Sequence, residues 1–171
     1  MKRKILLLIL LILFILILMV AWDFRFKTYK NEEYGFSFKY RATFMEKYDK
    51  DLLIWLRNEA GTMEISAVAK KVEKKADKTL EESGIGYANL IKALDSEKDV
   101  QILSNETIRI SKNSVEAQKV FVKVSGKTVV KEVAILIPLD DREITIRIIG
   151  GETVIDKNQG EIEKIIESIE I

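Results

Sequence analysis

The sequence contains no cysteine and no histidine, and its 171 residues include a single proline. Without cysteine there are no disulfides and no thiol nucleophiles, and without histidine the chain lacks the side chain most often used as a general base near neutral pH. A Ser-His-Asp triad or a Cys/His zinc site therefore cannot be built. The chain also lacks an excess of one charge, because 28 basic residues stand beside 27 acidic ones, and this balance argues against a nucleic-acid binder.

Charge is also missing from a long stretch near the N-terminus. After Lys2, Arg3 and Lys4, the run from Ile5 to Trp22 is uncharged and almost entirely apolar. As a helix rising about 1.5 Å per residue it would span roughly 27 Å, close to the hydrocarbon thickness of a bilayer. A buried core helix would carry a polar face, and this run has none. The sequence therefore predicts a transmembrane helix that begins at Ile5 and ends at Trp22.

The basic start of the chain predicts the orientation of this helix, with the N-terminus in the cytoplasm and the C-terminal remainder outside. Signal peptidase needs small residues at two positions before its cut, and here Ala21 is small but Met19 is not. The run is also longer than the usual apolar region of a signal peptide. We therefore favour an uncleaved single-pass anchor in the lipid bilayer, and a form secreted after signal cleavage is the alternative.

The rest of the chain is predicted to form one extracytoplasmic domain. We assign residues 1–22 to the basic start and anchor, 23–30 to a short juxtamembrane connector, and 31–171 to the domain. Apolar and polar residues alternate over 36–40, 63–69 and 143–149, as in half-buried strands, and 52–56 is a short apolar run typical of a buried strand. Residues 100–104 and 107–110 are expected to form short strands or one bent strand. Tight turns joining 115–124, 128–138 and 143–149 predict an antiparallel meander.

Two further segments have helical periodicity. In the first, from Leu80 to Leu94, Thr79 and Glu82 are spaced as a capping box, and Gly84 and Gly86 would let the helix approach a sheet closely. The second is a C-terminal stripe of isoleucines, at Ile162, Ile165, Ile166 and Ile169. The order strands, helix, strands, helix predicts an α+β fold, an antiparallel β-sheet flanked by helices.

Two stretches of the sequence carry a resemblance to a known family, NEEYGFSFKY over Asn31–Tyr40 and IEKIIESI over Ile162–Ile169. The first is similar to the opening of PsbP-like domains, and the second is similar to their closing helix. The chain departs from the family pattern at Arg41 and Phe44, where members usually have proline and then tryptophan. The resemblance covers about residues 29–171 and implies an α/β/α sandwich. It also implies binding to a partner rather than catalysis, since the family's known members include extrinsic subunits of photosystem II and a nuclear-transport factor.

Several short motifs of the sequence are candidate sites. Ser125–Thr128 resembles the end of a phosphate-binding loop but lacks its first glycine and following helix, so we expect a hairpin turn and no nucleotide. The acidic pairs at 32–33, 81–82 and 140–141 are expected on turns or an exposed helix face, where neither catalysis nor metal binding is predicted. The lysine-rich stretch 70–78 is expected to be a solvated loop. Asn105 begins a glycosylation sequon, which export would permit to be used.

These features together predict a membrane-tethered binding or accessory module that engages a protein partner at the outer membrane surface. We expect no catalytic residue, no metal and no cofactor, and no nucleic acid or nucleotide as partner. The alternative is a cell-surface hydrolase that relies on carboxylates. Two buried acids converging in a deep cleft would favour that alternative, whereas a shallow apolar patch on the sheet or its edge would favour the binding module.

Overall fold

The computed structural model describes residues 11, 12, 14, 25–72, 79–94, 97–110 and 115–171. Its strands are β1 (Phe26–Asn31), β2 (Phe36–Arg41), β3 (Phe44–Lys47), β4 (Ile54–Asn58), β5 (Met63–Lys71), β6 (Asp99–Ile110), β7 (Val115–Ser125), β8 (Val129–Pro138) and β9 (Arg142–Gly151). Its helices are α2 (Leu80–Leu94), α3 (Glu152–Lys157) and α4 (Gln159–Glu167).

Seven of these strands form one antiparallel sheet in the order β3-β4-β5-β9-β8-β7-β6, and β1 and β2 form a separate hairpin. The predicted meander is confirmed as β7, β8 and β9. Strands β4 and β5 form a hairpin that turns at Gly61, whose positive φ of 65° suits glycine. The hairpin of β1 and β2 likewise turns at Gly35, with φ 60°. The fold is therefore α+β, as the order of elements in the sequence predicts.

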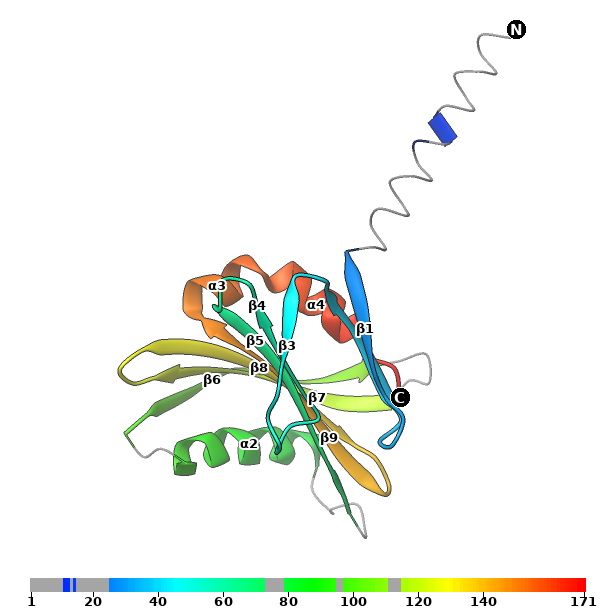
Figure 1. The fold of residues 1–171 in the computed structure, drawn as a ribbon. Helices are drawn as coiled ribbons and strands as arrows, with labels where there is room; N and C mark the ends of the chain where they lie inside the picture. Colours follow the sequence, from blue (N-terminus) through cyan, green and yellow to red (C-terminus); the bar gives the residue numbers. More distant parts are fainter. Residues whose placement is uncertain (1–10, 13, 15–24, 73–78, 95–96, 111–114) are drawn as a thin grey trace, which may run out of the picture.

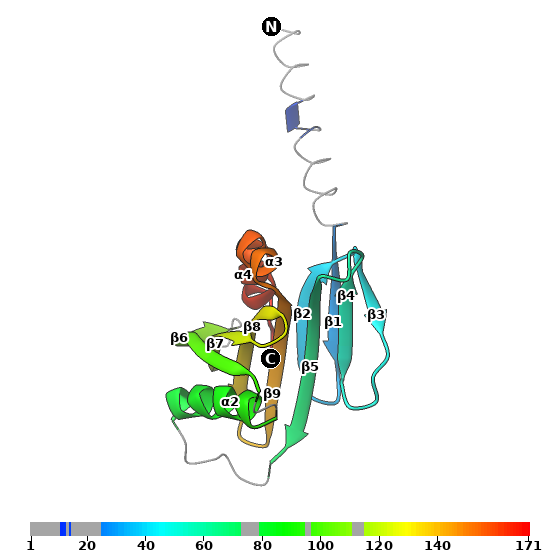
Figure 2. The ribbon, with the colours of Figure 1, turned by 90° about the vertical axis from the view of Figure 1, so that its left-hand side faces the viewer.

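The two faces of the sheet carry different layers (Figures 1 and 2). Helices α3 and α4 and the β1–β2 hairpin cover one face, and they enclose the larger core. Its fully buried side chains include Phe36, Phe38, Leu56, Ile65, Ile135, Ile146, Ile165 and Ile169. Helix α2 covers the other face over a smaller core built from Ala88, Val120, Val122 and Val124. The helices thus lie on both faces of a central sheet.

Helix α2 begins as its sequence predicts and packs closely on strand β6. The amide of Glu82 donates to the Thr79 hydroxyl at 3.1 Å, and the amide of Thr79 donates to the Glu82 carboxylate at 2.9 Å, which confirms the capping box. A Cβ on Gly84 would lie 2.1 Å from Asn105 Oδ1, whereas a Cβ on Gly86 would meet nothing within 4 Å. Close approach therefore explains Gly84 and leaves Gly86 unexplained.

Several element boundaries differ from those predicted. Residues 26–30, assigned to a connector, belong to β1, because they pair with β2 from Phe26 opposite Arg41 onward. For segments 100–104 and 107–110 the alternative of one bent strand is confirmed, because both belong to β6, which has a bulge between Ile102 and Ser104. Strand β3 and helix α3 were not predicted. Both are short, four and six residues, so neither shows a full period of alternation.

Most of the predicted anchor lies outside the described residues. Both of its ends, Ile5 and Trp22, lie outside the described residues. Leu11, Ile12 and Phe14, which are described, are helical and exposed. Within the described part of the chain, no helix has the length and apolarity to cross a membrane. The span from Ile5 to Trp22 stays a prediction from the sequence.

Candidate functional site

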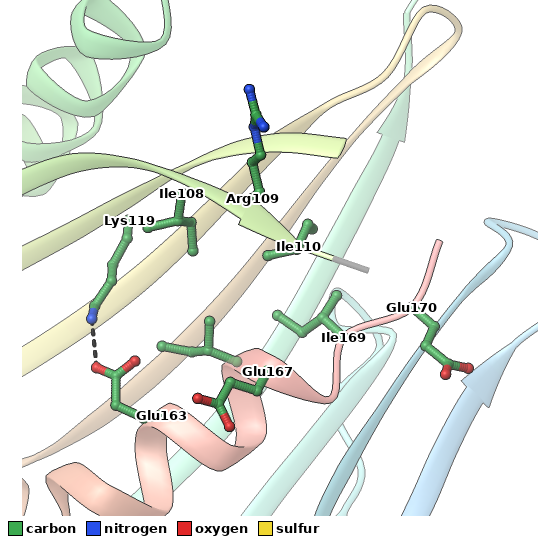
Figure 3. A pocket seen from close by; sticks show the side chains of 9 residues that line it. Ile108, Arg109, Ile110, Lys119, Glu163, Glu167, Ile169 and Glu170 are labelled. Atoms are coloured by element: carbon green, nitrogen blue, oxygen red, sulfur yellow. Dashed lines mark hydrogen bonds and ion pairs between the residues drawn. The ribbon is translucent and has the colours of Figure 1, made fainter. Parts of the chain in front are cut away.

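A groove of about 470 Å³ lies between helix α4 and the edge strand β6 (Figure 3). Its apolar surface comes from Ile108 and Ile110 of β6 and from Ile166 and Ile169 at the end of α4. Ile108 is half-buried, whereas the other three are buried. The groove is therefore a shallow aliphatic trough at the border of the larger core.

Strand periodicity puts these aliphatic side chains on the α4 side of the sheet. Ile108 and Ile110 lie opposite Ala117 and Val115 of β7, and all four pack in or against the larger core. The bulge between Ile102 and Ser104 leaves the rest of β6 in regular register with β7, so the alternation from Ser104 to Ile110 is unbroken. The bulge therefore marks one end of the regular edge beside the groove.

Charged side chains surround the trough. Lys119 of β7 donates to Glu163 of α4 at 2.5 Å, and this pair bridges the two walls (Figure 3). Glu167 and Glu170 are exposed and add negative charge on the α4 side. Arg109 points away from α4 in Figure 3, and its Nη2 lies 3.9 Å from Glu116. The α4 wall of the groove is therefore acidic.

A buried charge cluster lies on the other face of the sheet, under α2. Glu132 of β8 is 3% exposed and accepts from Arg147 of β9 at 2.6 and 3.2 Å, and from the Tyr87 hydroxyl of α2. Burial, and then the charge of Glu132, raise the pKa of Tyr87 well above its usual range. Burial lowers the pKa of Arg147, but the hydrogen bond and charge of Glu132 raise it more. The cluster holds α2 to the sheet and leaves no free acid or base.

A second buried carboxylate, Glu161, lies in the first turn of α4. Its Oε2 pairs with Arg41 at 2.9 Å, and its Oε1 has no hydrogen-bond partner. Burial raises the pKa of Glu161, and the nearby Arg41 opposes that shift. Because Glu132 faces α2 while Glu161 lies on α4, the two buried carboxylates occupy opposite faces of the sheet and do not converge.

The candidate glycosylation residue, Asn105, lies on β6 under the start of α2. Its side-chain nitrogen, the atom a glycan would use, donates to the Glu81 carbonyl at 3.1 Å. Its oxygen accepts from the buried Gln118 at 2.5 Å, and Gln118 in turn accepts from Thr107 at 3.0 Å. The folded domain thus uses the Asn105 amide to join α2 to the sheet.

The other motifs singled out from the sequence do not meet at one place. Ser125–Thr128 joins β7 to β8 as the predicted hairpin turn. The acidic residues of 32–33 and 140–141 lie in turns, where Glu32, Glu33 and Asp141 form ion pairs with basic neighbours. Lys70 and Lys71 end β5 and form ion pairs, and residues 73–78 lie outside the described part of the chain. No group of three acids in the described ranges is arranged to hold a metal ion.

The groove residues were not selected from the sequence. The four isoleucines of the C-terminal stripe are all buried in the larger core. The Ile-Arg-Ile alternation at 108–110 lies in a segment predicted as a strand, but its position at the sheet edge depends on strand order. The signal that could have found the groove is the combination of that alternation with the acidic C-terminal helix.

Comparisons with known proteins identify the fold. The solved structures that resemble this chain include cyanobacterial PsbP (CyanoP) from Synechocystis sp. PCC 6803, with a TM-score of 0.73, 13% identity, and coverage of 86% of this chain and 92% of that one. A mutant of the protein Mog1 matches with a TM-score of 0.61 and 12% identity, and the match covers 85% of this chain and 95% of that one. PA94 of Pseudomonas aeruginosa, a protein of unknown function, matches with a TM-score of 0.51 and 10% identity, and the match covers 84% of this chain and 95% of that one. No protein-family model and no curated protein matches the sequence. At these identities the likeness shows the fold, which is PsbP-like as the sequence resemblance indicated.

Proposed function

We propose that this chain is a membrane-tethered, extracytoplasmic binding module that engages a protein partner through the groove between α4 and β6. The groove is the observation that carries the proposal. An aliphatic floor bordered by charges, open to solvent along a sheet edge, is typical of a protein docking surface rather than of a catalytic cleft. The sequence resemblance to PsbP-like domains points in the same direction, as an analogy.

The distribution of ionisable groups also supports a binding role over the alternative of a carboxylate-dependent hydrolase. Glycosidase-type chemistry needs two carboxyl groups roughly 5–10 Å apart across one cleft. The two buried carboxylates, Glu132 and Glu161, are each paired with an arginine on opposite faces of the sheet. These two buried carboxylates are therefore not placed for that chemistry.

The tether is proposed from the sequence. The basic start and the apolar run from Ile5 to Trp22 would fix the domain beside the membrane, with its C-terminus outside. The described domain begins at β1, beside the α4 layer in Figure 1. A tether of this kind raises the effective concentration of the domain near membrane proteins, which favours a weak binder.

Site-directed photo-crosslinking in native membranes tests the proposal. A photo-reactive amino acid replaces Glu167, which is exposed on the groove wall, and a control chain carries it at Tyr48, which is 89% exposed. Tyr48 lies between β3 and β4, away from the groove. We expect a discrete adduct with another protein from position 167 and none from position 48. No adduct at 167, or the same adducts at both positions, would count against the groove as the binding site.

A further inference from the structure

The outer edge of β6 is unpaired along the groove. Beyond the bulge, Ser104–Ile110 pairs regularly with β7, and no strand in the described ranges lies on its other side. An edge strand leaves half of its backbone N–H and C=O groups without a strand partner, ready to bond another chain. The opposite edge of the sheet, β3, has only four residues. The long regular edge of the sheet is therefore the one beside the groove.

The side chains above this edge define what a neighbouring strand would meet. On the α4 side, β6 presents Glu106, Ile108 and Ile110, which lie opposite Lys119, Ala117 and Val115 of β7. A strand added outside β6 would place alternate side chains next to these three, where directly opposite side chains interact. Aliphatic side chains fit beside Ile108 and Ile110, and a basic side chain fits beside Glu106.

We propose that the groove binds an extended segment of a partner protein, which adds to the outer edge of β6 as a further strand. The segment carries two aliphatic side chains toward Ile108 and Ile110 and a lysine or arginine toward Glu106. This inference rests on the proposed function, because it names the partner chemistry of the same groove. Backbone hydrogen bonds supply affinity in this mode of recognition, and the alternate side chains supply specificity.

Charge complementarity identifies the partner as basic. Lys119, the cation that reaches across the groove, is already paired with Glu163 at 2.5 Å. Glu167 and Glu170 on the α4 side are exposed, and Arg109 points to the other face of the sheet (Figure 3). A bound segment therefore meets uncompensated negative charge on the α4 side, which favours lysine or arginine over acidic side chains.

The same charges disfavour a second copy of this chain. Two β6 strands paired antiparallel about a two-fold axis would keep the same face toward α4. The copy would then add its own Glu106 to the face that already carries Glu163, Glu167 and Glu170, and like charges placed together destabilise an interface. A heterologous segment with a basic residue at that position avoids this repulsion.

The test uses the full chain in mild detergent and a fluorescent peptide, Thr-Val-Thr-Val-Thr-Lys-Thr, which places two valines and the lysine on one face. Binding is measured by anisotropy, and hydrogen exchange with mass spectrometry locates the peptide. A second peptide has glutamate in place of lysine. Two more are N-methylated on alternate amides, one on the odd positions and one on the even, so that each loses hydrogen bonding along one edge.

Exchange protection in 104–110 and in the α4 end, without protection in β3, is the expected result. One of the two N-methylated peptides should bind at least about tenfold more weakly, and the other should bind like the parent. Glu167→Lys should weaken the lysine peptide about fivefold and favour the glutamate peptide. The matched control, Glu59→Lys on the exposed turn between β4 and β5, should leave both affinities within about twofold.

Four results would overturn the inference: no protection of β6, equal binding of both N-methylated peptides, equal binding of the lysine and glutamate peptides, or concentration-dependent protection of β6 without peptide. The last would identify a second copy as the occupant. If the crosslink from position 167 still forms when one of these is seen, the proposed function stands and the strand-addition mode is wrong. If the crosslink is also absent, the groove is not the binding site.

Discussion

Removal of one partner from the buried cluster under α2 should unfold this domain more readily than removal of a surface ion pair. Arg147→Met keeps much of the aliphatic volume but leaves the Glu132 carboxylate, 3% exposed, without its two bonds at 2.6 and 3.2 Å. An orphaned buried charge typically costs about 3–5 kcal/mol. The side chain of Arg147 is itself 35% exposed, so water can reach the site and we expect the lower end, about 3 kcal/mol.

Thermal denaturation of the full chain in mild detergent measures this cost. For a protein of this size, about 3 kcal/mol corresponds to a Tm lower by roughly 6–12 °C. The matched control is Arg57→Met, which breaks an ion pair with Glu64 that is 44% and 33% exposed and should cost about 1 kcal/mol or less.

A double variant separates the cost of an orphaned charge from a general packing defect. Glu132→Leu combined with Arg147→Met removes both charges, and replacement of a buried ion pair by apolar groups is often neutral. We expect the double variant to recover most of the stability lost in the single one. If Arg147→Met melts like Arg57→Met, or if the double variant is no more stable than Arg147→Met, the reasoning about the buried charge is wrong.

Three further predictions use other features of the chain. Gly84→Ala should lower the free energy of unfolding by about 1–3 kcal/mol, because its Cβ would lie 2.1 Å from Asn105. Gly86→Ala should raise it by up to about 1 kcal/mol. Equal melting temperatures of the two variants would contradict the close helix packing. Burial raises the pKa of Glu161 above the ordinary 4.5, so the free energy of unfolding should fall as the pH rises from 4.5 through the raised pKa. Glu161→Gln should make the Tm fall less steeply over this pH range, and an unchanged slope of Tm against pH would refute this. Protease added to intact spheroplasts should digest a C-terminal tag if the run from Ile5 to Trp22 is an anchor, and a protected tag would exclude the proposed topology.

The sequence predicts local structure here better than it predicts strand order. The alternation in 36–40 and 143–149, the capping box at Thr79 and the isoleucine stripe of α4 each depend on neighbours within a few residues, and the structure confirms them. These signals are strong because each repeats over at least one full period. The fold class followed from them and from the order of the elements.

The buried charge cluster under α2 and the sheet edge beside the groove both depend on contacts distant in sequence. The charge of Glu132 is balanced from β9 and α2, and the edge position of β6 depends on β7 being its only described neighbour in the sheet. No periodicity encodes such pairings. The shortest elements, β3 and α3, were missed for a related reason, since they form where the chain is held by neighbours rather than by their own pattern.

The groove forms because the residues at the end of α4 hydrogen-bond to β2, which lies away from β6. Ser168 Oγ accepts from the Lys39 amide at 2.8 Å, and Glu170 exchanges two backbone hydrogen bonds with Ser37, each 2.9 Å. These bonds align the C-terminal residues with the β1–β2 hairpin, so Ile108 on the outer strand remains half-buried instead of lying under the helix. The same C-terminal segment that closes the larger core through Ile169 therefore leaves an aliphatic strip beside a free strand edge. Closure of the core at β2 and exposure of the groove at β6 are consequences of one packing arrangement, which is why we place the binding surface there.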